Sequence, residues 1–380
     1  MKRFPKLEDS NNRMFDPQCT GELILNPPRT RTGEELLANG PVTVFAIPSE
    51  EERQSSATDR TQQNAYAAPD DETDNSNDGS RGGVWAVRPS APGLSSDSPV
   101  IWHYTDAAGF IGVISHSQVW ATALGNLNDT AEFSYGRKLL DHLLSEVNDS
   151  RHVHPIQKSY INFAVGLMDK AVSEEGLFVV CASTASHSLA QWRAYGGKQG
   201  HAVLLDPRQS LAVMAPTSVQ NKIDTIPHSW KRVLYDEQDQ RRLLLDGLST
   251  IAYSTPNDSS KEWRDDEAAR AQASLIAELV AYCKEPSFRE EQEVRMVVQA
   301  PSVESIQFRS SSTGITPYLC LTGTEFRTER TKTKSLKLPI VGCVVGPFDA
   351  RKSSAFAAGL LLNRHDYAEV PIEISSSTLR

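Results

Sequence analysis

From residue 100 onward, apolar and polar positions alternate in a way that predicts short strands separated by helices. Residues 101–105 and 119–122 have the composition of strands, and between them Phe110, Ile111 and Ile114 recur at helical spacing. This part of the chain is therefore expected to form strand, helix and strand, with Asp106 as the helix cap.

The same reasoning extends to the rest of the chain. It predicts helices near 129–147, 156–172, 188–195, 236–253, 262–283 and 350–362, and strands near 177–183, 201–206, 291–298, 305–309, 316–321, 340–345 and 370–374. Long helices fall mainly between the early strands, whereas the late strands come in hairpins. This mixture favours an α+β fold over a doubly wound parallel sheet.

Residues 1–98 differ from the remainder. They are rich in Ser, Pro, Asn, Gln and acidic residues, and such a segment buries too little apolar surface to offset its ordering entropy. We therefore expect a disordered N-terminal tail over 1–98 and a single α+β domain over 99–380. The apolar islands at 23–25 and 42–47 leave short docking strands as the alternative. Such a tail would serve export or hold a partner.

Composition narrows the class of protein. The net charge of -9 over 380 residues argues against a broad nucleic-acid footprint, although a local basic groove stays open. Five cysteines without a CxxC pair argue against a disulfide framework or a structural zinc site. No apolar run reaches the roughly 18 residues of a membrane span. These features predict a soluble protein of a reducing compartment, the cytoplasm, or one exported from a bacterium into a target cell.

Two short patterns carry candidate chemistry. His103 and Thr105 lie two apart, so on a strand they share a face, with Tyr104 on the other. Glu291, Glu293 and Arg295 would likewise share a face, where buried charges are costly unless paired or functional. The alternatives are a histidine that caps backbone groups and a solvated strand edge with a Glu293–Arg295 ion pair.

A third pattern joins the end of one strand to a short helix. Ser183 ends the strand, and the helix carries Trp192, Arg193 and Tyr195 before two glycines. Tyr195 could stack on a planar ring and Arg193 could bind a pyrophosphate. Trp192 is expected to pack in the core.

Asn128, Asp129 and Glu132 are sufficiently explained as a helix cap. The histidines form no set at metal-ligand spacing, so no metal site is predicted.

Taken together, these motifs resemble a bacterial family known as domain-of-unknown-function family 2971, over about residues 100–375. The matching pieces are 102–105, 127–129 with Glu132, 181–183, 191–196 with Gly200, 288–295, and 338–340 leading to 346–347. The opening His-x-Thr, helix and strand also looks like that of ADP-ribosyltransferases, including those that modify DNA bases.

The second resemblance implies ADP-ribosyltransferase-like split sheets with flanking helices and an NAD-dependent mono-ADP-ribosyltransferase. It also implies a toxin, effector or defence role, in which this glycosyltransferase transfers ADP-ribose from NAD to a protein or nucleic-acid acceptor. A chaperone, antitoxin or immunity partner would accompany such a protein.

The same resemblance implies roles for individual residues. His103, Tyr104 and Thr105 with Ser183, Arg193 and Tyr195 would bind NAD, Glu293 would stabilise the cationic ribose, and Glu291 would prepare the acceptor. The alternative is a catalytically inactive module that binds a ligand or partner, with Glu293 neutralised by Arg295.

Overall fold

The computed structural model describes residues 23, 25, 30–31, 44–46, 85–94, 100–126, 130–173, 176–214, 228–255, 267–311, 314–324 and 337–376. The strands are β1 (Thr30–Arg31), β2 (Val44–Ala46), β3 (Trp85–Val87), β4 (Ile101–Thr105), β5 (Val119–Ala123), β6 (Leu177–Ser183), β7 (His201–Leu205), β8 (Leu211–Val213), β9 (Lys231–Arg232), β10 (Glu293–Gln299), β11 (Gln307–Ser311), β12 (Gly314–Gly323), β13 (Ile340–Val345) and β14 (Ile372–Ile374). The α-helices are α3 (Ala107–His116), α4 (Thr130–Asp149), α5 (Pro155–Gly166), α6 (Met168–Ser173), α7 (Leu189–Tyr195), α8 (Glu237–Tyr253), α9 (Glu267–Ala281) and α10 (Arg351–Arg364).

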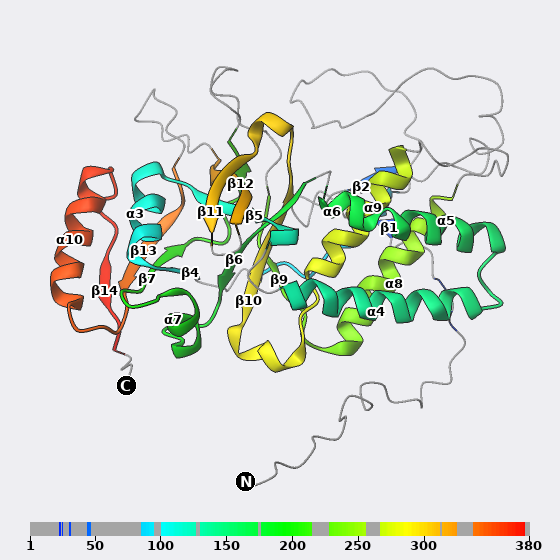
Figure 1. Ribbon diagram of the computed structural model, residues 1–380, viewed down its shortest axis with the longest axis horizontal. Helices are drawn as coiled ribbons and strands as arrows, with labels where there is room; N and C mark the ends of the chain where they lie inside the picture. The colour runs from blue at the N-terminus through cyan, green and yellow to red at the C-terminus, as the bar shows by residue number, and fades with distance from the viewer. Residues whose placement is uncertain are drawn as a thin grey trace, which may run out of the picture.

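One large mixed sheet organises the molecule. Its main path runs β11-β12-β5-β6-β4-β7-β13-β14, and β10 pairs with β6 and β9 off this path. Neighbouring strands are antiparallel except β13 and β14, which are parallel. Helices α4, α5, α6, α8 and α9 gather at one end, whereas α3 and α10 lie at the other (Figure 1).

Strand β6 is apolar along its whole length because both of its faces are covered. Leu177 and Val179 join the core of the helical end, whereas Phe178 and Val180 join the core beneath α3 and α10. Successive side chains of a strand point to opposite faces, so a strand covered on both sides is apolar without alternation. This accounts for the continuous apolar pattern that predicted the strand.

Helix α3 begins as its sequence predicts. The Asp106 carboxylate accepts a hydrogen bond from the Gly109 N–H at 2.7 Å, which satisfies one of the free donors of the first turn. A Cβ at position 109 would overlap Oγ1 of Thr105. Glycine is therefore required where the helix passes over the end of β4.

Most of the predicted tail lies outside the described residues, so its disorder stays a prediction. The described pieces form a small antiparallel sheet in the order β1-β3-β2, which includes part of the 42–47 island. The segment after β3 packs on the domain: Ala91 is buried, and Arg88 pairs with Glu278 at 3.0 Å. Packing against the main body therefore begins before residue 99.

Two element predictions are corrected. The helix expected near 156–172 is divided in two: α5 ends before Leu167, and α6 begins after it. The strand expected from Glu291 begins at Glu293, because the preceding residues form a 3-10 helix, Pro286–Glu291. The other elements predicted within the described residues are present, and together they make a mixed helix and sheet fold. Within these same residues, no helix combines the length and apolar character that crossing a membrane requires.

Candidate functional site

The candidate site lies where two strands separate along β6. One edge of β6 pairs with β10 over all seven residues, from Leu177 to Ser183. The other edge pairs with β5 at Phe178 and Val179, and with β4 only at Ser183. Among the described strands, none pairs with residues 180–182 on that second edge. Strands β4 and β5 therefore diverge there, and α3 connects them.

A cavity of about 650 Å³ occupies this divergence. Its lining comes from β4, α3, β5, β6, α7, β10 and β11. The cavity brings together six of the eight predicted site residues: His103, Tyr104, Thr105, Tyr195, Glu291 and Glu293. Residues far apart in the chain therefore meet in a space of the size that small-molecule ligands occupy.

His103 presents one ring nitrogen for interaction with a ligand. Its Nδ1 lies 3.0 Å from the carbonyl oxygen of Cys181. A carbonyl only accepts, so Nδ1 carries the proton and Nε2 keeps a lone pair in the neutral ring. Burial lowers the pKa of His103 and outweighs the hydrogen bond to Cys181, which raises it. The imidazole is thus held neutral, and His103 makes no second hydrogen bond within the described part of the chain.

Tyr104 lines the cavity but uses its hydroxyl group to hold α7. The hydroxyl donates to the carbonyl of Ala185 at 2.7 Å and accepts from the N–H of Ser188 at 3.2 Å. Its ring packs edge-on against Trp192 at 4.7 Å. Tyr195 at the end of α7 stays 44% exposed and faces the cavity. Tyr104 therefore positions the helix that carries Tyr195.

Two carboxylates and two cations form what we call the carboxylate cluster: Lys284, Glu291, Glu293 and Arg295. Arg295 donates from Nε and Nη2 to the two oxygens of Glu293, at 2.7 and 2.9 Å. The Lys284 ammonium, only 1% exposed, donates to Glu293 at 2.9 Å and also to Glu291. Two positive and two negative charges sum to zero, so the cluster satisfies its own buried charges.

This pairing determines the protonation state of Glu293. Burial of this residue, which is 7% exposed, raises its pKa. The charge and hydrogen bonds of Arg295, together with the charge of Lys284, lower the pKa by more than burial raises it. The net result is a pKa of about 2. Glu293 is therefore an ionised carboxylate at neutral pH.

The sequence predicts that Glu291 and Glu293 share one face of a strand. In the structure both contact the ammonium of Lys284, but they lie on different elements. Glu291 ends the 3-10 helix, and Gln292 then takes a left-handed conformation with φ of 43°. Residues with a side chain adopt this region infrequently. The turn brings both carboxylates to Lys284 although only Glu293 belongs to β10.

The cavity wall on the other side of β6 carries a separate arrangement, the guanidinium platform, made of Trp120, Thr122, Arg309 and Tyr318. The guanidinium carbon of Arg309 lies 5.7 Å from the centroid of the Trp120 ring. Its Nη2 donates to Oγ1 of Thr122 at 3.2 Å, and Tyr318 packs against Trp120 at 4.6 Å. Arg309, Trp120 and Thr122 line the cavity.

Two predicted binding residues lie elsewhere. Ser183 is buried and outside the cavity lining; its hydroxyl donates to the carbonyl of Glu291 at 2.5 Å. It therefore links β6 to the 3-10 helix. Arg193 is exposed and also outside the lining, because it lies on the solvent side of α7, whereas Trp192 is buried as predicted. The predicted capping residues Asn128 and Asp129 and the side chain of Glu132 lie outside the described residues.

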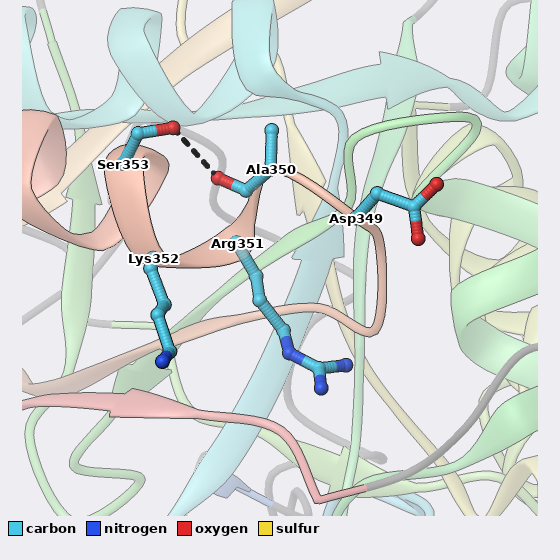
Figure 2. A pocket seen from close by; sticks show the side chains of 5 residues that line it. All are labelled: Asp349, Ala350, Arg351, Lys352 and Ser353. Atoms are coloured by element: carbon cyan, nitrogen blue, oxygen red, sulfur yellow. Dashed lines mark hydrogen bonds between the residues drawn. The ribbon is translucent and has the colours of Figure 1, made fainter.

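A second hollow of about 420 Å³ lies at the beginning of α10 (Figure 2). A single segment, Asp349 to Ser353, lines it, and the hydroxyl of Ser353 donates to the carbonyl of Ala350 at 2.9 Å. Arg351 and Lys352 extend from the first turn in roughly the same direction (Figure 2). This second hollow brings together no residues from distant parts of the chain, so the cavity along β6 is the better candidate for a functional site.

Comparison with known proteins adds one match. Residues 191–296 match the model of a family described as protein of unknown function DUF2971. Searches of curated proteins and of solved structures found no match. The matched stretch contains Tyr195 and the whole carboxylate cluster, whereas β4, α3 and Arg309 lie outside it.

Sequence reasoning missed Lys284 and the four residues of the guanidinium platform. Lys284 follows an apolar helix, so a charged residue there has the appearance of an ordinary helix end. Trp120 and Arg309 lie on predicted strands, but only the pairing of β12 with both β5 and β11 brings their strands into one sheet. The available signal was the pair Trp120 and Thr122, which lie two positions apart and therefore share a face of the predicted strand.

Proposed function

We propose that the protein is an NAD-dependent mono-ADP-ribosyltransferase that acts on a protein or nucleic-acid acceptor. The observation that carries the proposal is the convergence of His103, Tyr195, Glu291 and Glu293 on one cavity. The separation of β4 and β5 along β6 opens the space in which these residues meet, and it supports the same proposal.

The residues present suit a dinucleotide. The cavity volume of about 650 Å³ lies within the range of small-molecule sites. A neutral imidazole can contact a ribose hydroxyl, and the exposed Tyr195 ring can stack on a planar base. Bound NAD would supply a glycosidic bond from ribose to nicotinamide, a leaving group that carries positive charge before the bond breaks.

Each proposed role follows from the state of the side chain. His103 would bind ribose through Nε2, because Nδ1 is held by Cys181. The ionised Glu293 would stabilise positive charge that develops on the ribose as the bond to nicotinamide breaks. Glu291 would take the proton of the acceptor atom that forms the new bond to the same ribose carbon.

One observation favours a second candidate, a catalytically inactive module that binds a nucleotide-like ligand. Arg295 and Lys284 already neutralise Glu293. Stabilisation of a cation weakens when the carboxylate offered to it is paired with two other cations. Such a module would bind the ligand in the same cavity and leave the glycosidic bond intact.

The two candidates differ in whether nicotinamide is released. We would incubate the full chain with labelled NAD, with and without cell lysate, and measure nicotinamide release and label transfer. Glu293→Gln should abolish transfer, but it also breaks a buried ion pair and can reduce folding. A second variant, Gly112→Leu, avoids this difficulty.

Gly112 lines the cavity from α3, and a Cβ there would meet no atom within 4 Å. Leucine should fill the cavity while removing the cost of about 1 kcal/mol that glycine imposes within a helix. Gly166→Leu, at the end of α5 and equally free of contacts, is the matched control. Transfer by wild type and Gly166→Leu, lost in Gly112→Leu, would support the proposal. NAD binding without nicotinamide release would favour the inactive module.

A further inference from the structure

Arg309 is a cation that lines the cavity and has no acidic partner among the described residues. Of its N–H donors, Nη2 bonds to Thr122, and no acidic side chain of the described residues lies within ion-pair distance. Its Nε is shielded from solvent and has no hydrogen-bond partner. Arg309 is only partly buried, but a shielded donor such as Nε that lacks a partner carries a cost in free energy.

The acidic residues of the cavity are already engaged. Asp106 caps α3 through its bond to Gly109, and Glu291 and Glu293 bond to Lys284. The carboxylate cluster therefore has no carboxylate left over for Arg309. Within the described part of the chain, Arg309 thus has no carboxylate to balance it, and an anionic group of a ligand could take that place.

The guanidinium platform holds Arg309 ready for such an anion. The ring of Trp120 supports the guanidinium, and Tyr318 packs against that ring in turn. Thr122 fixes one end of the guanidinium plane through a single hydrogen bond. Fixing the side chain in advance reduces the entropy lost on binding.

From this arrangement we infer that Arg309 binds a phosphate group of the ligand, so that the cavity selects nucleoside phosphates over the corresponding nucleosides. A planar guanidinium can donate two parallel hydrogen bonds to phosphate. The inference rests on the proposed function for its choice of phosphate over a carboxylate. It places phosphate recognition on β11, whereas the sequence predicted it for Arg193 on α7.

The test measures what phosphate adds to binding. Binding of AMP and of adenosine to the full chain would be measured by calorimetry for wild type, Arg309→Gln and the control Arg193→Gln. A charge-assisted bidentate contact predicts that wild type binds AMP about tenfold to a hundredfold more tightly than adenosine. Arg309→Gln should lose this preference and keep its affinity for adenosine, and Arg193→Gln should keep both. Arg309→Lys should restore part of the preference, because it restores the charge without the planar fork.

Equal affinity of wild type for AMP and adenosine would overturn the inference, as would absence of binding by both or an undiminished preference in Arg309→Gln. The result is separable from the proposed function. A preference lost in Arg309→Gln, in a protein that never releases nicotinamide, keeps the phosphate site and rejects the transferase. Nicotinamide release that is unaffected by Arg309→Gln supports the transferase and rejects the phosphate site.

Discussion

The two charged arrangements on either side of β6 differ in how completely their charges are paired. In the carboxylate cluster, Lys284 and Arg295 together neutralise Glu291 and Glu293 through hydrogen bonds. On the guanidinium platform, Arg309 contacts an aromatic ring and a hydroxyl group, and the part of the chain that the structure describes offers it no carboxylate. Both line the same cavity through at least one member.

This difference separates two uses of a charge at the cavity. A buried charge that is fully paired within the chain is needed for folding, because removal of a partner leaves the other group uncompensated. A charge that lacks a partner of opposite sign contributes little to folding and is available to a ligand. The carboxylate cluster should therefore respond to mutation mainly in stability, and the platform mainly in binding.

The largest contrast is expected between Lys284→Met and Arg309→Gln. Loss of the Lys284 ammonium leaves Glu291 and Glu293 with too little positive charge, and should lower the free energy of unfolding by about 3–5 kcal/mol. Arg309→Gln loses one hydrogen bond and a ring contact, and should cost about 1 kcal/mol or less. Urea unfolding of both variants measures this, and equal losses would mean that the two arrangements do not differ as described.

Acid should weaken the carboxylate cluster in a defined pH range. The pKa of Glu293 is about 2 in the folded protein against 4.5 for an unperturbed group. In the folded state Glu293 therefore binds a proton only at lower pH than in the unfolded chain. The stabilisation that its ionised form provides is complete above pH 4.5 and is lost as the pH falls towards 2. A shift of this size corresponds to about 3 kcal/mol. Urea unfolding across this range should show that the free energy of unfolding of wild type falls with pH. In Glu293→Gln, the part of this fall that comes from protonation of Glu293 should be absent.

The smallest effect is expected at His103. The folded protein lowers the pKa of His103 below 6.5, so below that pH the unfolded chain binds a proton that the folded protein resists. Wild type should exceed His103→Gln in stability by about 1 kcal/mol or less at pH 8, through the bond to Cys181, and this advantage should shrink by pH 5. Urea unfolding at the two pH values measures the difference, and an advantage that grows in acid would show that the imidazole is protonated in the fold.

The elements of the fold were predictable where local pattern and burial agree. The apolar run of β6 predicted a covered strand, and Asp106 predicted the start of α3. The start of β10 was not predictable, because a left-handed Gln292 has no signature in the sequence. Only the packed chain selects that conformation over an extended one.

The site was predictable to the extent that its residues lie in recognisable short motifs. His103, Glu291 and Glu293 belong to such motifs, and the cavity contains all three. Lys284 and Arg309 were not found because their environment depends on distant residues. Arg309 contacts Thr122 across 187 positions, and no local pattern records that pairing. The activity itself stays a prediction.

The hydroxyl group of Tyr104 links two segments that the chain otherwise connects only through some eighty residues. It comes from the strand that holds His103, and it anchors the start of the helix that ends at Tyr195. The positions of the imidazole and the phenol of the cavity are therefore linked through Tyr104. A ligand that moves the start of α7 away from β4 must break these two hydrogen bonds, so Tyr104 helps to keep the cavity at its present width.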